Sequence, residues 1–168
     1  MSKAQIAAFL GEWEGYKVGT IQRCEAGQKG PKAQVWIELG PKERRELICS
    51  GCSEVSHQIH DYQWRRVRDL PILEAPCHLQ VQPRRVLCPR CGPKLEQLSW
   101  LDRHARITRR LAENVARLCA ILPIKHVADF YGLHWETVKR MAYGFRDDQV
   151  FFLEIRAVFP RDYVMNFF

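Results

Sequence analysis

The chain has 168 residues, enough for one or two small domains. Hydrophobic residues make up 46% of it, and no apolar run approaches the roughly 20 residues that a membrane span needs. Its formal net charge is +7, and residues 61–148 hold most of the excess, with sixteen basic against ten acidic side chains. A basic region of this kind favours a polyanionic partner and gives no reason to expect a membrane or a small-molecule substrate.

The first part of the chain is predicted to form a short helix and then strands. Residues 4–10 have helical spacing and end at a glycine. Residues 15–24 and 33–39 are predicted strands, because in the second of them Val35, Ile37 and Leu39 alternate with outward positions. A turn rich in glycine, residues 25–31, separates the two strands.

Two Cys-x-x-Cys steps follow, Cys49 with Cys52 and Cys88 with Cys91. Each step contains Gly or Pro and predicts a tight turn that directs two thiolates at one point. Four thiolates about 2.3 Å from Zn²⁺ complete a tetrahedral shell, which is the geometry of one structural zinc rather than a catalytic one. Thirty-five residues separate the two pairs, against roughly 15–20 in the common spacing, so the intervening segment is a substantial insertion.

Other interpretations of the cysteines are weaker. Disulfides need an oxidising compartment, and the N-terminus has no export signal. A redox Cys-x-x-Cys lies near a βαβ pattern, which this sequence lacks. Iron accepts the same four ligands and stays open beside zinc. Three histidines near the pairs, His57, His60 and His78, are the alternative ligands. The remaining cysteines are predicted to be small core residues: Cys24, Cys77 and Cys119.

Between the cysteine pairs lies a basic stretch in which Trp64 precedes Arg65, Arg66 and Arg68. These arginines either hold a phosphate backbone or form a solvated face that pairs with neighbouring aspartates, and the sequence leaves both alternatives open. Residues 77–82 are a further predicted strand, and Arg84 and Arg85 before the second pair are further candidate phosphate contacts. We expect residues 1–97 to form one β-rich unit around the metal, which supplies much of the unit's folding free energy.

A helix is predicted after Thr108, a suitable N-cap. Its apolar residues recur at helical spacing as far as Leu122, and its other face carries Arg109 and Arg110, candidate DNA contacts. Pro123 ends this helix and begins the next.

Residues 124–143 predict a helix-turn-helix. The first helix turns its Val127 and Tyr131 inward, and Gly132 permits the left-handed conformation of a sharp turn. The second helix turns Val138 and Met141 inward and would enter the major groove. The alternative is an ordinary helical hairpin within a helical core.

The outward residues of this second helix are rich in hydrogen-bonding groups, and its candidate DNA contacts are His134, Trp135, Glu136, Lys139 and Arg140. Arg140 has the bidentate geometry that reads guanine. Glu136 either accepts from cytosine or pairs with Arg140 four residues on, and we favour the ion pair.

The order of these motifs resembles the N-terminal half of bacterial insertion-sequence transposases of the ISL-three type, over roughly residues 10–145. The resemblance rests on the four cysteines, on residues 68–71, 84–85 and 108–110, and on the helix-turn-helix. It implies zinc binding, recognition of terminal inverted repeats, and a separate ribonuclease-H-like catalytic domain with three metal-binding carboxylates. Such transposases continue for a few hundred residues past the helix-turn-helix, whereas this chain ends at Phe168.

We therefore expect an α+β protein with a zinc-bearing domain over residues 1–97, a helical DNA-binding domain over 98–146, and a tail over 147–168 that is the start of a catalytic region. The expected function is sequence-specific binding of double-stranded DNA by a truncated or split transposase, without catalysis of its own. A cytoplasmic, nucleoid-associated location follows from that expectation, and a homodimer is open. The alternatives are a zinc-containing transcriptional regulator and a zinc-stabilised protein–protein adaptor.

Overall fold

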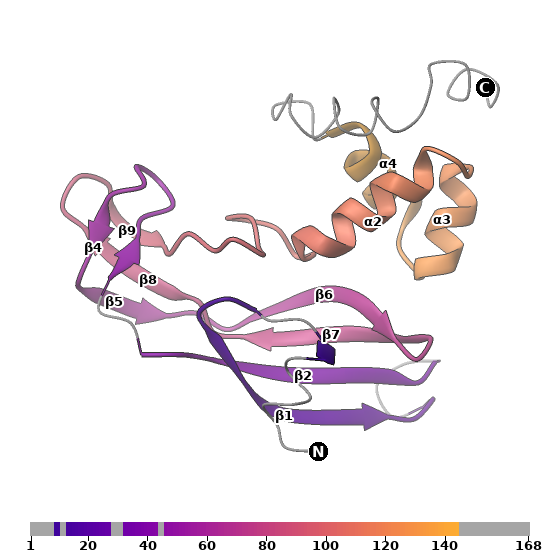
Figure 1. Ribbon diagram of the computed structural model, residues 1–168, viewed down its shortest axis with the longest axis horizontal. Coiled ribbons are helices and arrows are strands. Elements are labelled where there is room, and N and C mark those ends of the chain that lie inside the picture. Colours follow the sequence, from indigo (N-terminus) through magenta and orange to yellow (C-terminus); the bar gives the residue numbers. More distant parts are fainter. Residues whose placement is uncertain (1–8, 11–12, 28–31, 44–45, 145–168) are drawn as a thin grey trace. The chain divides into compact units, whose positions relative to one another are not determined.

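The chain folds as a strand-rich part followed by the helices α2, α3 and α4 (Figure 1). The computed structural model describes residues 9–10, 13–27, 32–43 and 46–144. Two compact units make up the chain, Met1–Arg109, which we call the strand unit, and Arg110–Phe168, which we call the helical unit. This organisation confirms the predicted α+β class. The predicted boundary between residues 97 and 98 stays a prediction, and the predicted tail lies outside the described residues.

A four-stranded sheet forms the body of the strand unit, with strand order β1-β2-β7-β6. Its outer pairs are antiparallel, whereas β2 and β7 run parallel. The strands are β1 (Tyr16–Cys24), β2 (Gln34–Pro41), β6 (Arg65–Ile72) and β7 (Ala75–Val81). The predicted strands over residues 15–24, 33–39 and 77–82 are thereby confirmed. Of the predicted helix over residues 4–10, only residues 9 and 10 are described, and both are helical.

One face of this sheet carries the hydrophobic core of the strand unit. Alternate residues of β2 and β7 point into it, among them Ile37 and Leu79, both fully buried. Trp100 and Leu101, from the segment after the second cysteine pair, complete the same core. The alternating residues of the sequence therefore lie on the buried face as predicted, because alternate side chains of a strand lie on opposite faces.

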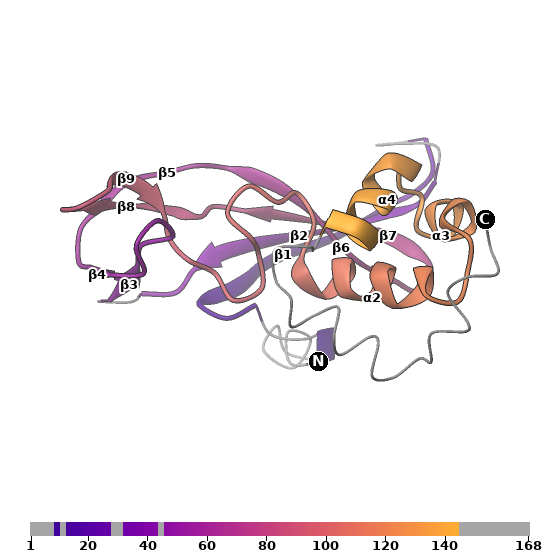
Figure 2. The same cartoon turned by 90° about the horizontal axis from the view of Figure 1, so that it is seen from above.

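Shorter strands hold the cysteines, and β8 and β9 extend beyond the end of the four-stranded sheet (Figure 2). β5 (Ile59–Tyr62), β8 (Arg84–Cys88) and β9 (Gly92–Leu95) form an antiparallel sheet, and β3 (Leu47–Ile48) pairs with β4 (Val55–Ser56). Leu47 and Val86 pack with the cysteines in a cluster of their own. The strand unit thus contains two hydrophobic clusters, one in the four-stranded sheet and one at the cysteines.

Asp69 fastens the segment before α2 to the sheet. Its side chain is fully buried, and it accepts hydrogen bonds from Trp13 Nε1 at 3.0 Å and from Thr108 Oγ1 at 2.7 Å. Backbone hydrogen bonds join Arg68 to Arg106 and Thr108 beside it. A buried carboxylate needs such donors, so the Arg-Asp-Leu-Pro motif at residues 68–71 has a structural explanation.

The helical unit contains most of α2 (Arg109–Cys119), and α3 (Ile124–Tyr131) and α4 (Trp135–Gly144). All three predicted helices are confirmed. α3 and α4 contact each other, and their buried residues are Val127, Ala128, Tyr131, Val138 and Met141. Among the residues that the structure describes, no helix has the length and apolar character needed to cross a membrane.

Candidate metal centre and nucleic-acid interface

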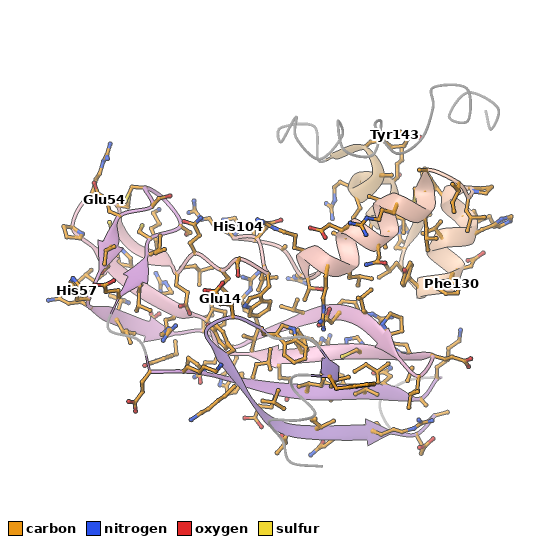
Figure 3. The ribbon with its side chains drawn as sticks, viewed as in Figure 1. Glu14, Glu54, His57, His104, Phe130 and Tyr143 are labelled. Carbon is orange, nitrogen blue, oxygen red and sulfur yellow. The ribbon has the colours of Figure 1, made fainter. Side chains whose placement is uncertain are left out.

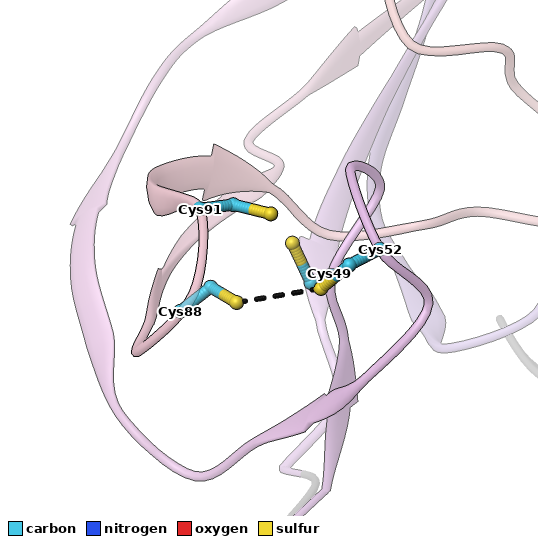
Figure 4. Close-up of side chains that lie close together, drawn as sticks. All are labelled: Cys49, Cys52, Cys88 and Cys91. Atoms are coloured by element: carbon cyan, nitrogen blue, oxygen red, sulfur yellow. Dashed lines mark hydrogen bonds between the residues drawn. The ribbon is translucent and has the colours of Figure 1, made fainter.

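The four predicted ligands meet at one point, although two of them come from each end of a long insertion (Figure 4). The ligand sulfur atoms of Cys49, Cys52, Cys88 and Cys91 all lie within 4.8 Å of one another, and Cys52 Sγ lies 3.5 Å from Cys88 Sγ. A tetrahedral shell with Zn–S bonds of about 2.3 Å places its sulfur atoms about 3.8 Å apart. The arrangement therefore fits a single tetrahedral metal ion bound by four sulfur atoms.

The backbone of the two turns leaves room for the sulfur atoms. A side chain on Gly51 would place its Cβ 3.2 Å from Cys91 Sγ, and the Gly51 N–H donates to Cys49 Sγ at 3.3 Å. Gly92, after the second pair, has a φ of +69°, which favours glycine. Glycine is thus favoured in the first turn by the close approach of a sulfur atom and after the second pair by the backbone conformation.

The thiols of the cluster differ in their pKa values. A backbone hydrogen bond from Cys91 lowers the pKa of the Cys88 thiol to about 7, against the effect of burial. A backbone hydrogen bond with Glu54 acts to lower the pKa of Cys52, but burial and hydrogen bonds with the other cysteines raise it to about 12. Thiolates this close repel one another, so a bound divalent cation is what allows all four to ionise.

The alternative histidine ligands lie elsewhere. His60 Nδ1 is 3.0 Å from Asp61 Oδ2, and His78 lies in β7, stacked on Trp36. Among the residues that the structure describes, the four cysteines are the one cluster able to hold a metal ion.

The turn between α3 and α4 has the predicted left-handed conformation. Gly132 has φ 60° and ψ 41°, and its N–H donates to Asp129 O, while the Leu133 N–H donates to Ala128 O. This pairing satisfies carbonyl groups at the end of α3 and ends the helix sharply. Val138, fully buried, fills the angle that follows.

The candidate contacts of α4 all lie on its exposed side: His134, Trp135, Glu136, Lys139 and Arg140. The Glu136 N–H donates to His134 Nδ1 at 3.3 Å, so this histidine also stabilises the start of α4. Lys139 Nζ lies 5.3 Å from the centre of the Trp135 ring. The ion pair expected between Glu136 and Arg140 is absent, although the structure describes both residues. Arg140 therefore keeps its guanidinium available for another partner.

The candidate arginines of the strand unit differ in their surroundings. Arg65 donates to the carbonyl oxygens of Arg103 and Ala105, and Arg66, exposed, lies over the Trp36 ring. Arg85 is partly exposed and pairs with Asp61 at 2.8 Å. The sequence alone does not predict β6 as a strand, because its three arginines hide the alternation in which Val67 and Asp69 point inward.

Arg84 is an interior residue. Its side chain is 3% exposed and pairs with Glu96 at 2.6 Å, and Nη1 donates to Lys42 O at 2.8 Å. The Tyr16 hydroxyl donates to the same carboxylate, and burial, followed by the Glu96 charge, raises the pKa of Tyr16. These contacts assign Arg84 to the packing of the strand unit.

Arg109 and Arg110 lie at the start of α2. Arg109 is exposed and pairs with Asp102 at 2.7 Å, and Arg110 is half-buried.

A four-cysteine metal site followed by a helix-turn-helix defines a class of zinc-containing DNA-binding proteins. The model of the zinc-finger of transposase IS204/IS1001/IS1096/IS1165 matches residues 45–91, and that of the helix-turn-helix domain of transposase family ISL3 matches residues 96–143. The chain therefore carries the zinc-finger and helix-turn-helix domains of the ISL3 transposase family, and the resemblance drawn from its sequence is confirmed.

A curated relative extends the likeness. The transposase for insertion sequence element IS1001 from Bordetella parapertussis is 39% identical over 142 residues, which cover 84% of this chain and 34% of that protein. The chain thus spans about a third of the length of the relative that it matches. No solved structure matches the chain.

Proposed function

We propose that this chain binds double-stranded DNA at the terminal inverted repeats of a mobile element, as the recognition part of a transposase. The exposed polar face of α4 carries the proposal, because the left-handed Gly132 and the buried Val138 hold that helix as the second helix of a helix-turn-helix. In such motifs the second helix lies in the major groove and its early residues contact base edges.

Within this proposal Arg140 reads a guanine, and Lys139, Glu136 and Trp135 contact the same groove or its phosphates. Arg66, Arg85, Arg109 and Arg110 are proposed phosphate contacts. Arg65 contributes to DNA binding indirectly, because it holds the segment before α2 in place. Arg84 is not a proposed DNA contact, because its guanidinium is buried against Glu96.

The proposed metal is one structural Zn²⁺ per chain, held by the four cysteines. When bound, the ion cross-links the two Cys-x-x-Cys turns and fixes the hairpin formed by β8 and β9. Elemental analysis of freshly purified protein should give one zinc per chain, and Co²⁺ substitution should give the visible absorption of a tetrahedral thiolate site. Purified, folded protein with no bound metal would contradict the assignment.

Selection from a pool of randomised duplexes tests the DNA-binding function. The zinc-loaded chain should enrich one sequence, and that sequence should occur as an inverted pair at the ends of the element that encodes the chain. Enrichment of a sequence found only at a promoter would instead indicate a transcriptional regulator. A pool that stays random after repeated rounds would contradict sequence-specific binding.

Binding without catalysis is also a proposal. Incubation of the chain with Mg²⁺ and a duplex that carries the selected sequence should leave both strands intact. The footprint on an inverted pair should show whether one or two chains occupy the DNA, which tests the proposed homodimer. Such a protein would be found on the bacterial nucleoid.

A further inference from the structure

The strand unit contains a large hollow with a strongly basic lining. It has a volume of about 940 Å³, and its lining carries seven cationic side chains, three from β6, one from β8, one from β9 and two from the segment before α2. That segment, which carries His104, leads from β9 to α2 (Figure 3). No aspartate or glutamate is among the lining residues, all of which belong to the described part of the chain. A concave surface with one sign of charge focuses the electrostatic potential.

Several of these cations also serve the fold. The Arg65 guanidinium donates to two backbone carbonyl groups and holds the segment over β6, while Arg68 Nη1 lies 3.1 Å from His78 Nε2. Three other cationic side chains do not hold the fold together in this way. Arg66, Arg103 and Arg106 are exposed, and no salt bridge joins them to a carboxylate in the part of the chain that the structure describes. Their charges are therefore not neutralised within the strand unit.

One of the residues that line the hollow, His78, is held by an aromatic contact. The rings of Trp36 and His78 stack with their centres 4.7 Å apart and their planes at 21°, and the Arg66 guanidinium lies 5.6 Å from the Trp36 ring centre. Burial, with the charges of Arg68 and Arg66, lowers the pKa of His78 to about 4. Burial and the two arginine charges all disfavour the protonated ring, so His78 is neutral at pH 7.

We propose that this hollow binds the sugar–phosphate backbone of nucleic acid, as a second contact surface that works independently of α4. The inference rests on the proposed DNA-binding function and assigns it a site that includes Arg103 and Arg106, which motif analysis of the sequence misses. Guanidinium groups bind phosphate oxygens bidentately, and the Arg66 guanidinium already lies over the Trp36 ring.

Two forms of nucleic acid share this backbone chemistry. A duplex would present phosphates alone, whereas a single strand would also stack a base on Trp64, which lies at the hollow and is 58% exposed. The two sources are separable because only the second depends on the tryptophan ring.

The test is the triple variant Arg66→Ala, Arg103→Ala, Arg106→Ala in the full zinc-loaded chain. Truncating these exposed side chains spares the backbone carbonyl groups of residues 103 and 106 that bond β6. The matched control removes three exposed cations elsewhere on the strand unit, Lys17→Ala, Arg23→Ala and Arg90→Ala. Both proteins should keep wild-type zinc content and near-UV circular dichroism.

Binding to a duplex and to a single strand, both of arbitrary sequence, is measured between 50 and 200 mM salt. Each lost phosphate contact should flatten the log–log salt dependence by about 0.9. Three lost contacts should therefore flatten it by about 2.7 and weaken binding roughly 500-fold at 0.1 M salt, with the loss vanishing near 1 M. The control should change the slope by less than one. Equal slopes and affinities for the two variants on both the duplex and the single strand would overturn the proposal.

The same samples separate this proposal from the proposed function. The hollow variant should retain the wild-type ratio of affinities for the selected and a scrambled duplex, because α4 is untouched. If wild type shows no such ratio but the hollow variant still loses affinity, then only sequence-specific recognition fails. Trp64→Ala assigns the source: a loss confined to single strands indicates a single strand, and unchanged binding of both forms indicates a duplex.

Discussion

Arg84 provides a sharp test of how the strand unit is held together. Its Nη2 lies 2.6 Å and its Nε 3.0 Å from Glu96 Oε2, and the carboxylate is 6% exposed. Arg84→Ala would leave that carboxylate buried with hydrogen bonds but no cation. Removing one partner of a buried ion pair costs about 3–5 kcal/mol of unfolding free energy, a large share of a domain's total. With a urea dependence of about 2 kcal/mol per molar, the midpoint should fall by about 2 M.

The assay is urea unfolding at saturating zinc, followed by tryptophan fluorescence, to which Trp13 and Trp100 in the core contribute. Arg85→Ala is the matched control, because this neighbouring arginine pairs with the partly exposed Asp61, and its loss should cost less than about 1 kcal/mol. In a double-mutant cycle, Arg84→Ala with Glu96→Ala should cost roughly 2 kcal/mol less than the sum of the single changes. A variant Arg84→Ala that unfolds at the wild-type urea concentration, yet binds DNA more weakly, would show that this arginine contacts DNA instead.

Three further changes test the metal, the anchor and the turn. Cys88→Ser leaves three thiolates and should lose much of the roughly 10–16 kcal/mol that structural zinc supplies. In competition with a chelator, the variant should release zinc at a lower chelator concentration than wild type. Equal zinc retention by the two proteins would refute the four-sulfur site. Asp69→Ala removes the acceptor of the Trp13 and Thr108 hydrogen bonds and should cost roughly 3 kcal/mol in the same urea assay. Almost no loss would show that these hydrogen bonds do not anchor the segment. Val138→Asp buries a charge between α3 and α4, so far-UV circular dichroism should lose helix while zinc content is unchanged; full helicity would mean that this position is not interior.

Local patterns made the metal site and the helix-turn-helix predictable. Two Cys-x-x-Cys steps specify four converging ligands without any knowledge of the insertion between them, because each pair is fixed by its own turn. The second helix of the helix-turn-helix is likewise set by Gly132 and by the spacing of Val138 and Met141. In both cases the information lies within a few neighbouring residues.

Partners distant in sequence were not predictable in the same way. Arg84 resembles a surface arginine until β8 and β9 pair and bring Glu96 to it, twelve residues along the chain. The basic hollow depends on a segment near residue 103 folding over β6, where Arg65 bonds to carbonyl groups 38 and 40 residues away. The separate sheet core was hidden too, because Trp100 and Leu101 lie beyond the predicted end of the strand domain.

In the proposed function, α4 is the element that reads DNA sequence. The direct measurement is the affinity of wild type and of Arg140→Ala for the selected duplex and for duplexes with each base pair changed in turn, with Lys139→Ala as the control. Arg140→Ala should lose about 1–3 kcal/mol on the selected duplex and become indifferent at one base pair, whereas Lys139→Ala should bind every duplex more weakly by a similar factor. An Arg140→Ala protein with the full wild-type preference at every base pair would contradict the placement of α4 in the major groove.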